Sequence, residues 1–321
     1  MKSYPMSKRI TEDLQSVESG LIEAVSSPRG ILSEIALDTL TAGGKRLRPA
    51  LVLICGQAGD YSSQRLLPAA VAVELVHTAS LVHDDILDRA VIRRGAPTVY
   101  AAWGERMASA AGDFLFAKAF ECLAGLSDPA ALVALSDAAV ALCLGEFEQM
   151  QTAHLPHQSV EGYLGKIERK TAALFAACCR LGGILAGADE PEIEALEKYG
   201  YDLGIAFQIY DDILDFTGGA ALGKPTGTDL RDGTVTMPML YAMDELKESR
   251  ALVAVIEALN PDDREVFHAI ELVERSCALD RAKAQARSFV DRAIAVAGGL
   301  SNQAVAKQLS TIGEFVIDRY S

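Results

Sequence analysis

The chain has 321 residues, of which 50% are hydrophobic and 23% are charged, an ordinary composition for a folded globular protein. It carries 44 acidic and 30 basic residues, which gives a formal net charge of −14 at pH 7. A field of this sign repels nucleic acid and anionic membrane surfaces. We therefore expect no nucleic-acid partner, and any anionic ligand would need a local cluster of cations or a metal ion.

The N-terminal sequence and the cysteines predict a cytoplasmic protein. Residues 1–14 contain no apolar stretch of the signal-peptide type. The six cysteines are scattered through apolar segments without a C-x-x-C pair, which favours free thiols in a reducing compartment. The longest apolar runs, such as residues 66–73, are too short to cross a bilayer, so we expect no transmembrane segment.

Apolar residues recur at intervals of three and four along most of the chain, the spacing of amphipathic helices. The pattern is clear in residues 69–90 and again in residues 131–150, and no run of alternating Val, Ile and Thr predicts a strand. Gly and Pro gather at a few breaks, the longest of which covers residues 218–233. We therefore predict an all-α fold of about ten or more helices in a single domain, residues 1–321.

The sequence DDILD occurs twice, at residues 84–88 and 211–215. In a helix, the first and last aspartates of each copy share a face, where neighbouring carboxylates repel each other. An apolar stretch precedes each copy, which favours a position for both motifs at the mouth of a cavity. Oxygen ligands of this kind suit Mg²⁺, whose shell substrate phosphates complete. The alternative is two solvated acidic turns, whereas an EF-hand is excluded because its D-x-D-x-D-G spacing is missing.

A phosphorylated substrate would also need cations, and the chain supplies several of them near these motifs. Residues 43–49 read GGKRLRP and residues 93–95 read RRG, while Lys170 and Lys224 follow further along the chain. Arg is well suited to phosphate because it donates two parallel hydrogen bonds. Taken singly, each of these cations is more often a surface charge. Nucleotide binding is disfavoured because the chain has neither a Walker A motif nor G-x-G-x-x-G after a strand.

His77 is a further candidate because it lies two helical turns before Asp84, on nearly the same face. A single histidine in a helix is usually structural, and that alternative stays open.

Taken together, these segments resemble the trans-isoprenyl diphosphate synthases, the polyprenyl synthetase family. The likeness extends over most of the chain: GGKRLRP at 43–49, VELVHTASLVHDDILDRAVIRRG at 73–95, ERKTAALF at 168–175, GIAFQIYDDILDFTG at 204–218 and LGKPTGTDLRDGTVTMP at 222–238. Two DDxxD motifs combined with the other elements at these spacings are specific to the family. A terpene cyclase fits less well because it carries a different second metal motif, and a squalene-type synthase differs in its aspartate motifs and their flanks.

The resemblance implies an isoprenoid-synthase helical bundle around a deep central cavity, usually as a homodimer. It also implies three Mg²⁺ ions that bridge the allylic diphosphate to six aspartates: Asp84, Asp85, Asp88, Asp211, Asp212 and Asp215. The diphosphate would leave to give an allylic cation, which isopentenyl diphosphate would attack before a proton is lost to form a trans double bond. Metal ions and cations in a water-poor cavity are well suited to neutralise the leaving group.

The resemblance also assigns the remaining residues of the site by position. Isopentenyl diphosphate would be held by Lys45, Arg48, His77 and Arg94. The allylic substrate and its diphosphate would be served by Arg93, Lys170, Thr171, Gln208 and Lys224. The residues expected to be catalytic are Asp84, Asp85, Asp88, Lys170, Thr171, Gln208 and Asp211. Many members carry a lysine near Thr234, so one expected cation is absent here, and whether Arg231 replaces it is left open.

The residues one to two turns before Asp84 predict the length of the product. The product should grow along this helix past Ser80, Ala79 and Val76, none of which is aromatic. Short-chain members of the family place Phe or Tyr four or five residues before the first aspartate. One helical turn rises about 5.4 Å, close to one isoprene unit, so we expect an all-trans polyprenyl diphosphate of about C30–C50, centred on C35–C40.

Two alternatives to a long-chain synthase are kept. The first is a short-chain farnesyl or geranylgeranyl diphosphate synthase. The second is a non-catalytic subunit that only binds prenyl diphosphates, which six intact aspartates argue against. Some relatives work with a second, catalytically poor subunit, and this chain would then be the catalytic partner.

Overall fold

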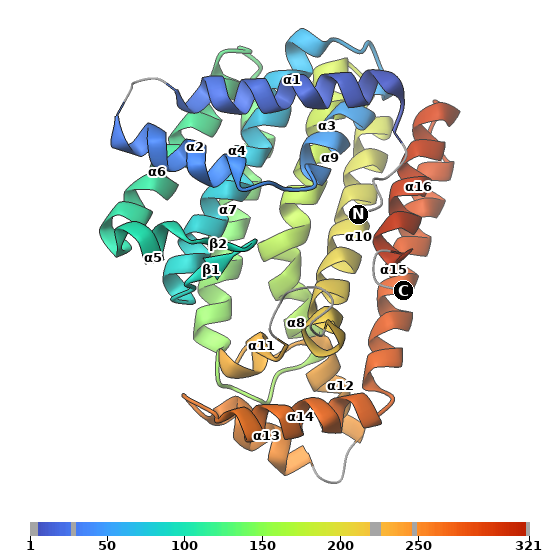
Figure 1. Cartoon of the computed structure of the whole chain (residues 1–321). Helices are drawn as coiled ribbons and strands as arrows, with labels where there is room; N and C mark the ends of the chain where they lie inside the picture. Colours follow the sequence, from blue (N-terminus) through green and yellow to red (C-terminus); the bar gives the residue numbers. More distant parts are fainter. Residues whose placement is uncertain (1–5, 27–29, 219–225, 246–248, 319–321) are drawn as a thin grey trace. The chain divides into compact units, whose positions relative to one another are not determined.

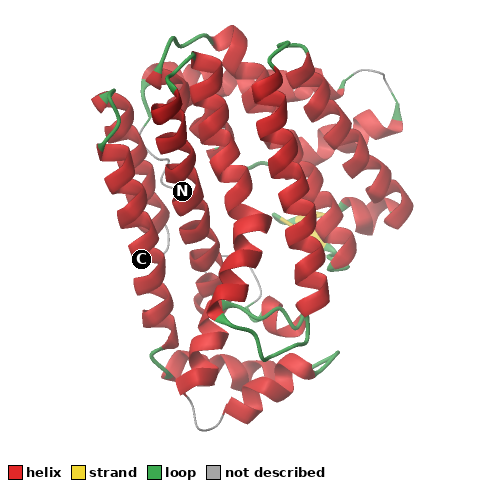
Figure 2. Cartoon of the chain, turned by 180° about the vertical axis from the view of Figure 1, so that it is seen from behind, coloured by secondary structure: helices red, strands yellow, loops and turns green. Residues whose placement is uncertain are grey.

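The computed structural model describes residues 6–26, 30–218, 226–245 and 249–318. Helices account for most of this part of the chain (Figures 1 and 2), which confirms the all-α prediction. The only strands in the described ranges are β1 (Ile92–Arg93) and β2 (Ala96–Pro97), which form one antiparallel hairpin. The sequence did not predict this hairpin, because two-residue strands are too short to show an alternating pattern.

The helices follow one another in this order: α1 (Lys8–Val25), α2 (Ile31–Thr41), α3 (Leu47–Cys55), the 3₁₀ helix η1 (Gly56–Ala58), α4 (Ser63–Leu87), α5 (Val99–Trp103), α6 (Glu105–Ala124), α7 (Pro129–Thr152), α8 (Val160–Ile167), the π-helical segment η2 (Glu168–Ala172), α9 (Ala173–Ala186), α10 (Glu190–Thr217), α11 (Thr228–Arg231), α12 (Met237–Glu245), α13 (Ser249–Glu257), α14 (Asp263–Arg275), α15 (Ala278–Gly298) and α16 (Gln303–Asp318).

The chain divides into two compact units, and neither is one continuous stretch of sequence. The first unit comprises Met1–Ala139, Ala177–Glu197 and Leu300–Gln308. The second unit comprises Val140–Ala176, Lys198–Gly299 and Leu309–Ser321. A single domain over residues 1–321 stays a prediction.

Helix α4 is the centre of the first unit, where it packs against α6, α3 and α1. Every residue from Ala69 to Val76 is buried, including the charged Glu74. A helix that is apolar on nearly every side is typical of a protein core, which accounts for the burial of this stretch. The first aspartate motif lies at the C-terminal end of α4 and is therefore carried by a largely buried helix.

By length and composition alone, α4 and α7 could each span a membrane. The uninterrupted apolar runs in the sequence are too short to indicate this property. It is weak evidence, because 72% of the relevant stretch of α4 is buried inside the protein, as in the core helix of a soluble protein. The predicted cytoplasmic location stays a prediction.

The second unit is built on the C-terminal part of α10, which carries the second aspartate motif. Leu203, Ile209 and Ile213 on this helix are buried. The hydroxyl of Tyr199 donates a hydrogen bond of 2.8 Å to the carbonyl oxygen of Leu309, which joins α10 to α16. Helix α12 packs on α15 and α13, and α13 packs on α14.

Candidate active site

The first aspartate motif closes α4, and its three carboxylates differ in exposure. Asp85 is buried, Asp84 is half-buried and Asp88, at the C-cap, is exposed. The Nε of Arg93 donates a hydrogen bond of 2.7 Å to Asp85. Burial raises the pKa of Asp85, although the charge and hydrogen bond of Arg93 partly lower it. Carboxylates are disfavoured at the C-terminal end of a helix, so a cation at this position would stabilise the motif.

The β1–β2 hairpin brings Arg93 and Arg94 to this end of α4. Its turn residues Arg94 and Gly95 have φ angles of 54° and 81°, as in the tight turns that join two-residue hairpins. Arg93 contacts Asp85, whereas the Nη1 of Arg94 lies 3.2 Å from the position that a Cβ on Gly44 would occupy. The hairpin therefore links the aspartate motif to the segment that contains Lys45 and Arg48.

Several arginines act electrostatically on His77, and its assignment to the isopentenyl diphosphate site stays a prediction. Burial holds the pKa of His77 well below its usual value, and the positive charges of Arg48 and Arg94 lower it further. A neutral imidazole can offer one donor and one acceptor without adding to the positive charge. The first unit therefore brings three of the four predicted residues together, and the fourth, Lys45, lies in the same segment as Arg48.

The three residues assigned to chain length are all buried in α4. Val76 and Ala79 are fully buried, and the hydroxyl of Ser80 donates a hydrogen bond of 2.8 Å to the carbonyl oxygen of His77. Their role in chain length stays a prediction.

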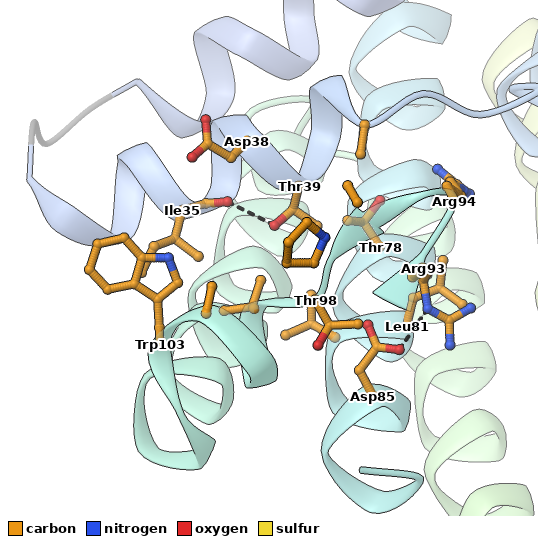
Figure 3. A pocket seen from close by; sticks show the side chains of 16 residues that line it. Ile35, Asp38, Thr39, Thr78, Leu81, Asp85, Arg93, Arg94, Thr98 and Trp103 are labelled. Carbon is orange, nitrogen blue, oxygen red and sulfur yellow. Dashed lines mark hydrogen bonds and ion pairs between the residues drawn. The ribbon is translucent and has the colours of Figure 1, made fainter. Parts of the chain in front are cut away.

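A cavity of about 310 Å³ lies on a different face of α4 from the predicted chain-length residues (Figure 3). Thr78, Leu81 and Asp85 line it from α4, and Trp103 closes the opposite side. None of the three predicted chain-length residues lines this cavity. It therefore does not correspond to the expected path of elongation.

The second aspartate motif has its own hydrogen-bond network. Asp212 is buried and accepts hydrogen bonds from the Tyr163 hydroxyl at 2.5 Å and from the Gln208 amide at 2.8 Å. The Thr171 hydroxyl donates to the side-chain oxygen of Gln208 at 2.7 Å. Burial raises the pKa of Asp212 to about 7, with a further contribution from Asp211. The predicted residues Thr171, Gln208 and Asp212 thus form one connected chain.

Asp215 joins the motif to α11. Its two carboxylate oxygens accept hydrogen bonds from the backbone N–H groups of Thr228 and Asp229, each at 3.0 Å. Burial, followed by the charges of Asp215, Asp212 and Asp211, holds the pKa of Asp229 well above its usual value. Sequence reasoning did not single out Asp229. The charges of Asp215, Asp212 and Asp211 thus disfavour the ionised form of Asp229, and a nearby cation would relieve this effect.

The donor set fits Mg²⁺ only with help from a substrate. Among the described residues, no group of three or more His, Cys, Asp or Glu side chains is arranged to hold a metal ion. Mg²⁺ keeps several waters and uses one or two carboxylates together with substrate phosphates. Both aspartate motifs suit that mode of binding.

The predicted Lys170 and Thr171 lie in the π-helical segment η2, an irregularity typical of functional sites. Gly145 on α7 allows a close approach there, because a Cβ at Gly145 would lie 2.5 Å from the backbone nitrogen of Lys170. The Lys170 ammonium group pairs with Glu146 at 2.5 Å. The π turn thus places Thr171 toward Gln208 and Lys170 toward α7.

The remaining cations of the second unit have different surroundings. Lys224 lies outside the described residues. Arg231 forms an ion pair of 3.0 Å with Asp263 at the start of α14. The backbone N–H of Thr234 donates to the carbonyl oxygen of Asp229 at 2.8 Å.

Lys166, which sequence reasoning missed, is buried and donates to the carbonyl oxygen of Val235 at 3.2 Å, and burial lowers its pKa.

Comparison with known proteins places these features in context. The sequence profile described as polyprenyl synthetase matches residues 29–273. The chain is 44% identical to heptaprenyl diphosphate synthase component 2 of Geobacillus stearothermophilus, over 94% of this chain and 93% of the relative. It is 38% identical to a short chain isoprenyl diphosphate synthase of Methanothermobacter thermautotrophicus, over 91% of this chain and 94% of the relative. A solved polyprenyl synthase of Caulobacter crescentus CB15, complexed with calcium and isoprenyl diphosphate, is similar over 100% of both chains, with a TM-score of 0.93 and 33% identity.

Proposed function

The chain belongs to the polyprenyl synthetase family, and we propose that it condenses isopentenyl diphosphate with an allylic diphosphate in repeated, Mg²⁺-dependent head-to-tail steps. The observation that carries this proposal is the arrangement of the second aspartate motif: Asp215 accepts hydrogen bonds from the backbone of α11, and Asp215, Asp212 and Asp211 act together on Asp229, an effect that a divalent cation would relieve. The cluster of Arg48, Arg94 and His77 in the first unit supports it, since it offers several cationic or neutral donors to a second diphosphate.

In the proposed reaction, the allylic carbon–oxygen bond breaks, a carbon–carbon bond forms to isopentenyl diphosphate, and a proton leaves to complete the trans double bond. When bound at the two aspartate motifs, Mg²⁺ would neutralise the diphosphate that leaves, and the family resemblance implies three such ions. Lys45, Arg48, Arg94 and His77 hold the diphosphate of isopentenyl diphosphate. Thr171 and Gln208 act on the allylic substrate, and the Gln208 amide also orients Asp212.

We assign the product to the range of about C30–C50, centred on C35–C40, from the spacing of one helical turn per isoprene unit. The absence of an aromatic side chain at Ala79 and Ser80 supports this length. The alternatives are a short-chain synthase and a non-catalytic binding subunit, and relatives of both the long-chain and short-chain kinds share more than a third of their residues with this chain.

One experiment separates these three functions. The purified protein is incubated with Mg²⁺, radiolabelled isopentenyl diphosphate and geranyl, farnesyl or geranylgeranyl diphosphate, and the dephosphorylated products are sized by reversed-phase chromatography. A long-chain synthase gives products beyond C20, and a short-chain synthase stops at C15 or C20. A binding subunit consumes no isopentenyl diphosphate, and that result would contradict the proposed activity.

We further propose that the protein works as a dimer through an exposed apolar face of α7. Val140, Leu144 and Phe147 lie on one face of this helix in the second unit, and each is more than half exposed. A second copy is the proposed occupant, and a catalytically poor partner subunit is the alternative. Light scattering coupled to gel filtration should give the mass of a dimer for the wild type and of a monomer for Phe147→Glu.

A further inference from the structure

Arg46 stands in the middle of the GGKRLRP segment, between Lys45 and Arg48, and its environment is unusual for an arginine. Its relative exposure is 9%, and its backbone has a φ of 49°, in the left-handed region that residues other than glycine rarely adopt. It is the N-cap of α3, so this left-handed residue sets the direction in which the chain enters that helix. A non-glycine residue stays in such a conformation only when its surroundings hold it there.

The guanidinium group of Arg46 stabilises this conformation through four hydrogen bonds. Its Nη1 donates to Glu74 at 2.8 Å, and its Nη2 donates to the carbonyl oxygen of Leu40 at 2.8 Å. Its Nε and Nη2 donate to the two carboxylate oxygens of Glu18, at 2.6 and 3.1 Å. One side chain therefore connects the segment to α1, α2 and α4.

Glu74 is the critical partner because it is a buried carboxylate in an otherwise apolar part of α4, with a relative exposure of 3%. A buried carboxylate must be paired, and Arg46 provides the ion pair. The charge of Glu74 also acts favourably on Arg94. A Cβ on Gly44 would lie 3.0 Å from Arg46 and 3.2 Å from Arg94, so both guanidinium groups lie against the backbone of this segment.

We propose that Arg46, anchored by Glu74 and Glu18, is a positioning residue that fixes the Gly43–Arg48 segment and thereby places Lys45 and Arg48 for the diphosphate of isopentenyl diphosphate. This inference rests on the proposed function. Arg46 itself uses its donors within the protein, so its effect on substrate is exerted through its two neighbours.

Steady-state kinetics with the full chain test this role. Arg46→Ala should raise KM for isopentenyl diphosphate by about tenfold or more, while kcat and KM for the allylic primer stay within about threefold. Arg46→Gly should behave similarly, because glycine adopts the left-handed conformation freely but lacks the guanidinium group. The matched control is Arg65→Ala, which removes an ion pair to Asp128 (3.0 Å) elsewhere in the first unit and should change neither KM.

The outcomes separate this inference from the proposed function. If the wild type consumes no isopentenyl diphosphate, the proposed function fails, whatever the variants do. If the wild type is active and Arg46→Gly keeps a normal KM for isopentenyl diphosphate, the guanidinium group does not position the segment. A loss of kcat at unchanged KM would indicate a purely structural role and would also overturn the inference.

Arg46→Lys decides the matter if the smaller substitutions do not fold. Lysine keeps the positive charge beside Glu74, but it lacks the planar fork that reaches Glu18, Glu74 and Leu40 together. We expect KM for isopentenyl diphosphate to rise by about tenfold in this variant as well, and hydrogen exchange at residues 44–48 to quicken while α4 stays protected. Wild-type values in both measurements would overturn the proposal.

Discussion

The hydroxyl group of Tyr163, a fully buried side chain, donates a hydrogen bond of 2.5 Å to Asp212 in the second aspartate motif. Together with the Gln208 amide it stabilises the charged form of a carboxylate that burial would otherwise keep protonated. The hydrogen bond therefore prepares Asp212 to bind a cation, because a carboxylate must lose its proton to act as a ligand.

Removal of this hydroxyl should weaken metal binding without changing the fold. In Tyr163→Phe, Asp212 keeps its proton to higher pH, and the Mg²⁺ concentration for half-maximal activity should rise by about ten- to a hundredfold. Activity measured over a series of Mg²⁺ concentrations provides the test. Tyr61→Phe is the matched control, because the Tyr61 hydroxyl donates a hydrogen bond of 2.5 Å to Asp13, and neither residue belongs to an aspartate motif. Equal Mg²⁺ dependence in the two variants would contradict this role.

The aspartates themselves should be needed for turnover and not for stability. Asp84→Ala or Asp211→Ala should reduce turnover by about a thousandfold or more, because each removes a proposed metal ligand. Each also removes a charge that repels its neighbours, so the helix should not lose stability. Product formation at saturating Mg²⁺ tests the first effect, and thermal unfolding followed by circular dichroism tests the second. Near-normal turnover in either variant would mean that the metal assignment is wrong.

The pKa of Asp212 predicts how the stability of the metal-free protein depends on pH. Because the folded-state pKa is about 7 and the usual value is 3.8, the folded state binds more protons than the unfolded state between these limits. The free energy of unfolding should therefore fall as pH rises from about 4 to 7 and level off above it. Denaturant unfolding in EDTA at several pH values tests this prediction. In Asp212→Asn, which cannot titrate, the free energy of unfolding should no longer show this pH dependence. Mg²⁺ should correspondingly stabilise the wild type more at pH 8 than at pH 6.

The sequence predicted the elements that depend on patterns within one segment, and it could not predict contacts between residues that are distant along the chain. The helices and both DDILD motifs follow from spacing within one segment. The pairing of Arg46 with Glu74 joins positions 28 residues apart, and no local signal indicates it beyond a lone acid in an apolar helix. The close approach of Gly145 to the π turn at Glu168–Ala172 is equally invisible in sequence, because the two segments are distant along the chain.

Restoring a lysine at Thr234, near where the resemblance implies one in many members of the family, should affect only one substrate. Thr234 lies beside Asp229 in the second unit, so Thr234→Lys would add a cation there, worth about 1.5–3 kcal/mol at best in a charge-assisted contact. KM for the allylic primer should fall by about tenfold or more, and KM for isopentenyl diphosphate should stay nearly unchanged. Arg231→Ala is the companion variant, and it should leave the primer KM unchanged because Arg231 pairs with Asp263. An unchanged primer KM in Thr234→Lys, together with a raised one in Arg231→Ala, would assign the missing cation to Arg231.

The length of the product should depend on one face of α4. Ala79 and Ser80 lie just before Asp84 and are buried, and no aromatic ring blocks this part of the helix. Ala79→Phe or Ser80→Phe should place a floor about one turn from the aspartates and shorten the product to about C15–C20, while isopentenyl diphosphate is still consumed. Leu81→Phe is the matched control, because Leu81 lines the cavity on a different face of the same helix and should leave product length unchanged. Chromatographic sizing of the dephosphorylated products provides the measurement. A wild type that stops at C20 or below, or Phe variants that still make long products, would show that the growing chain follows another path.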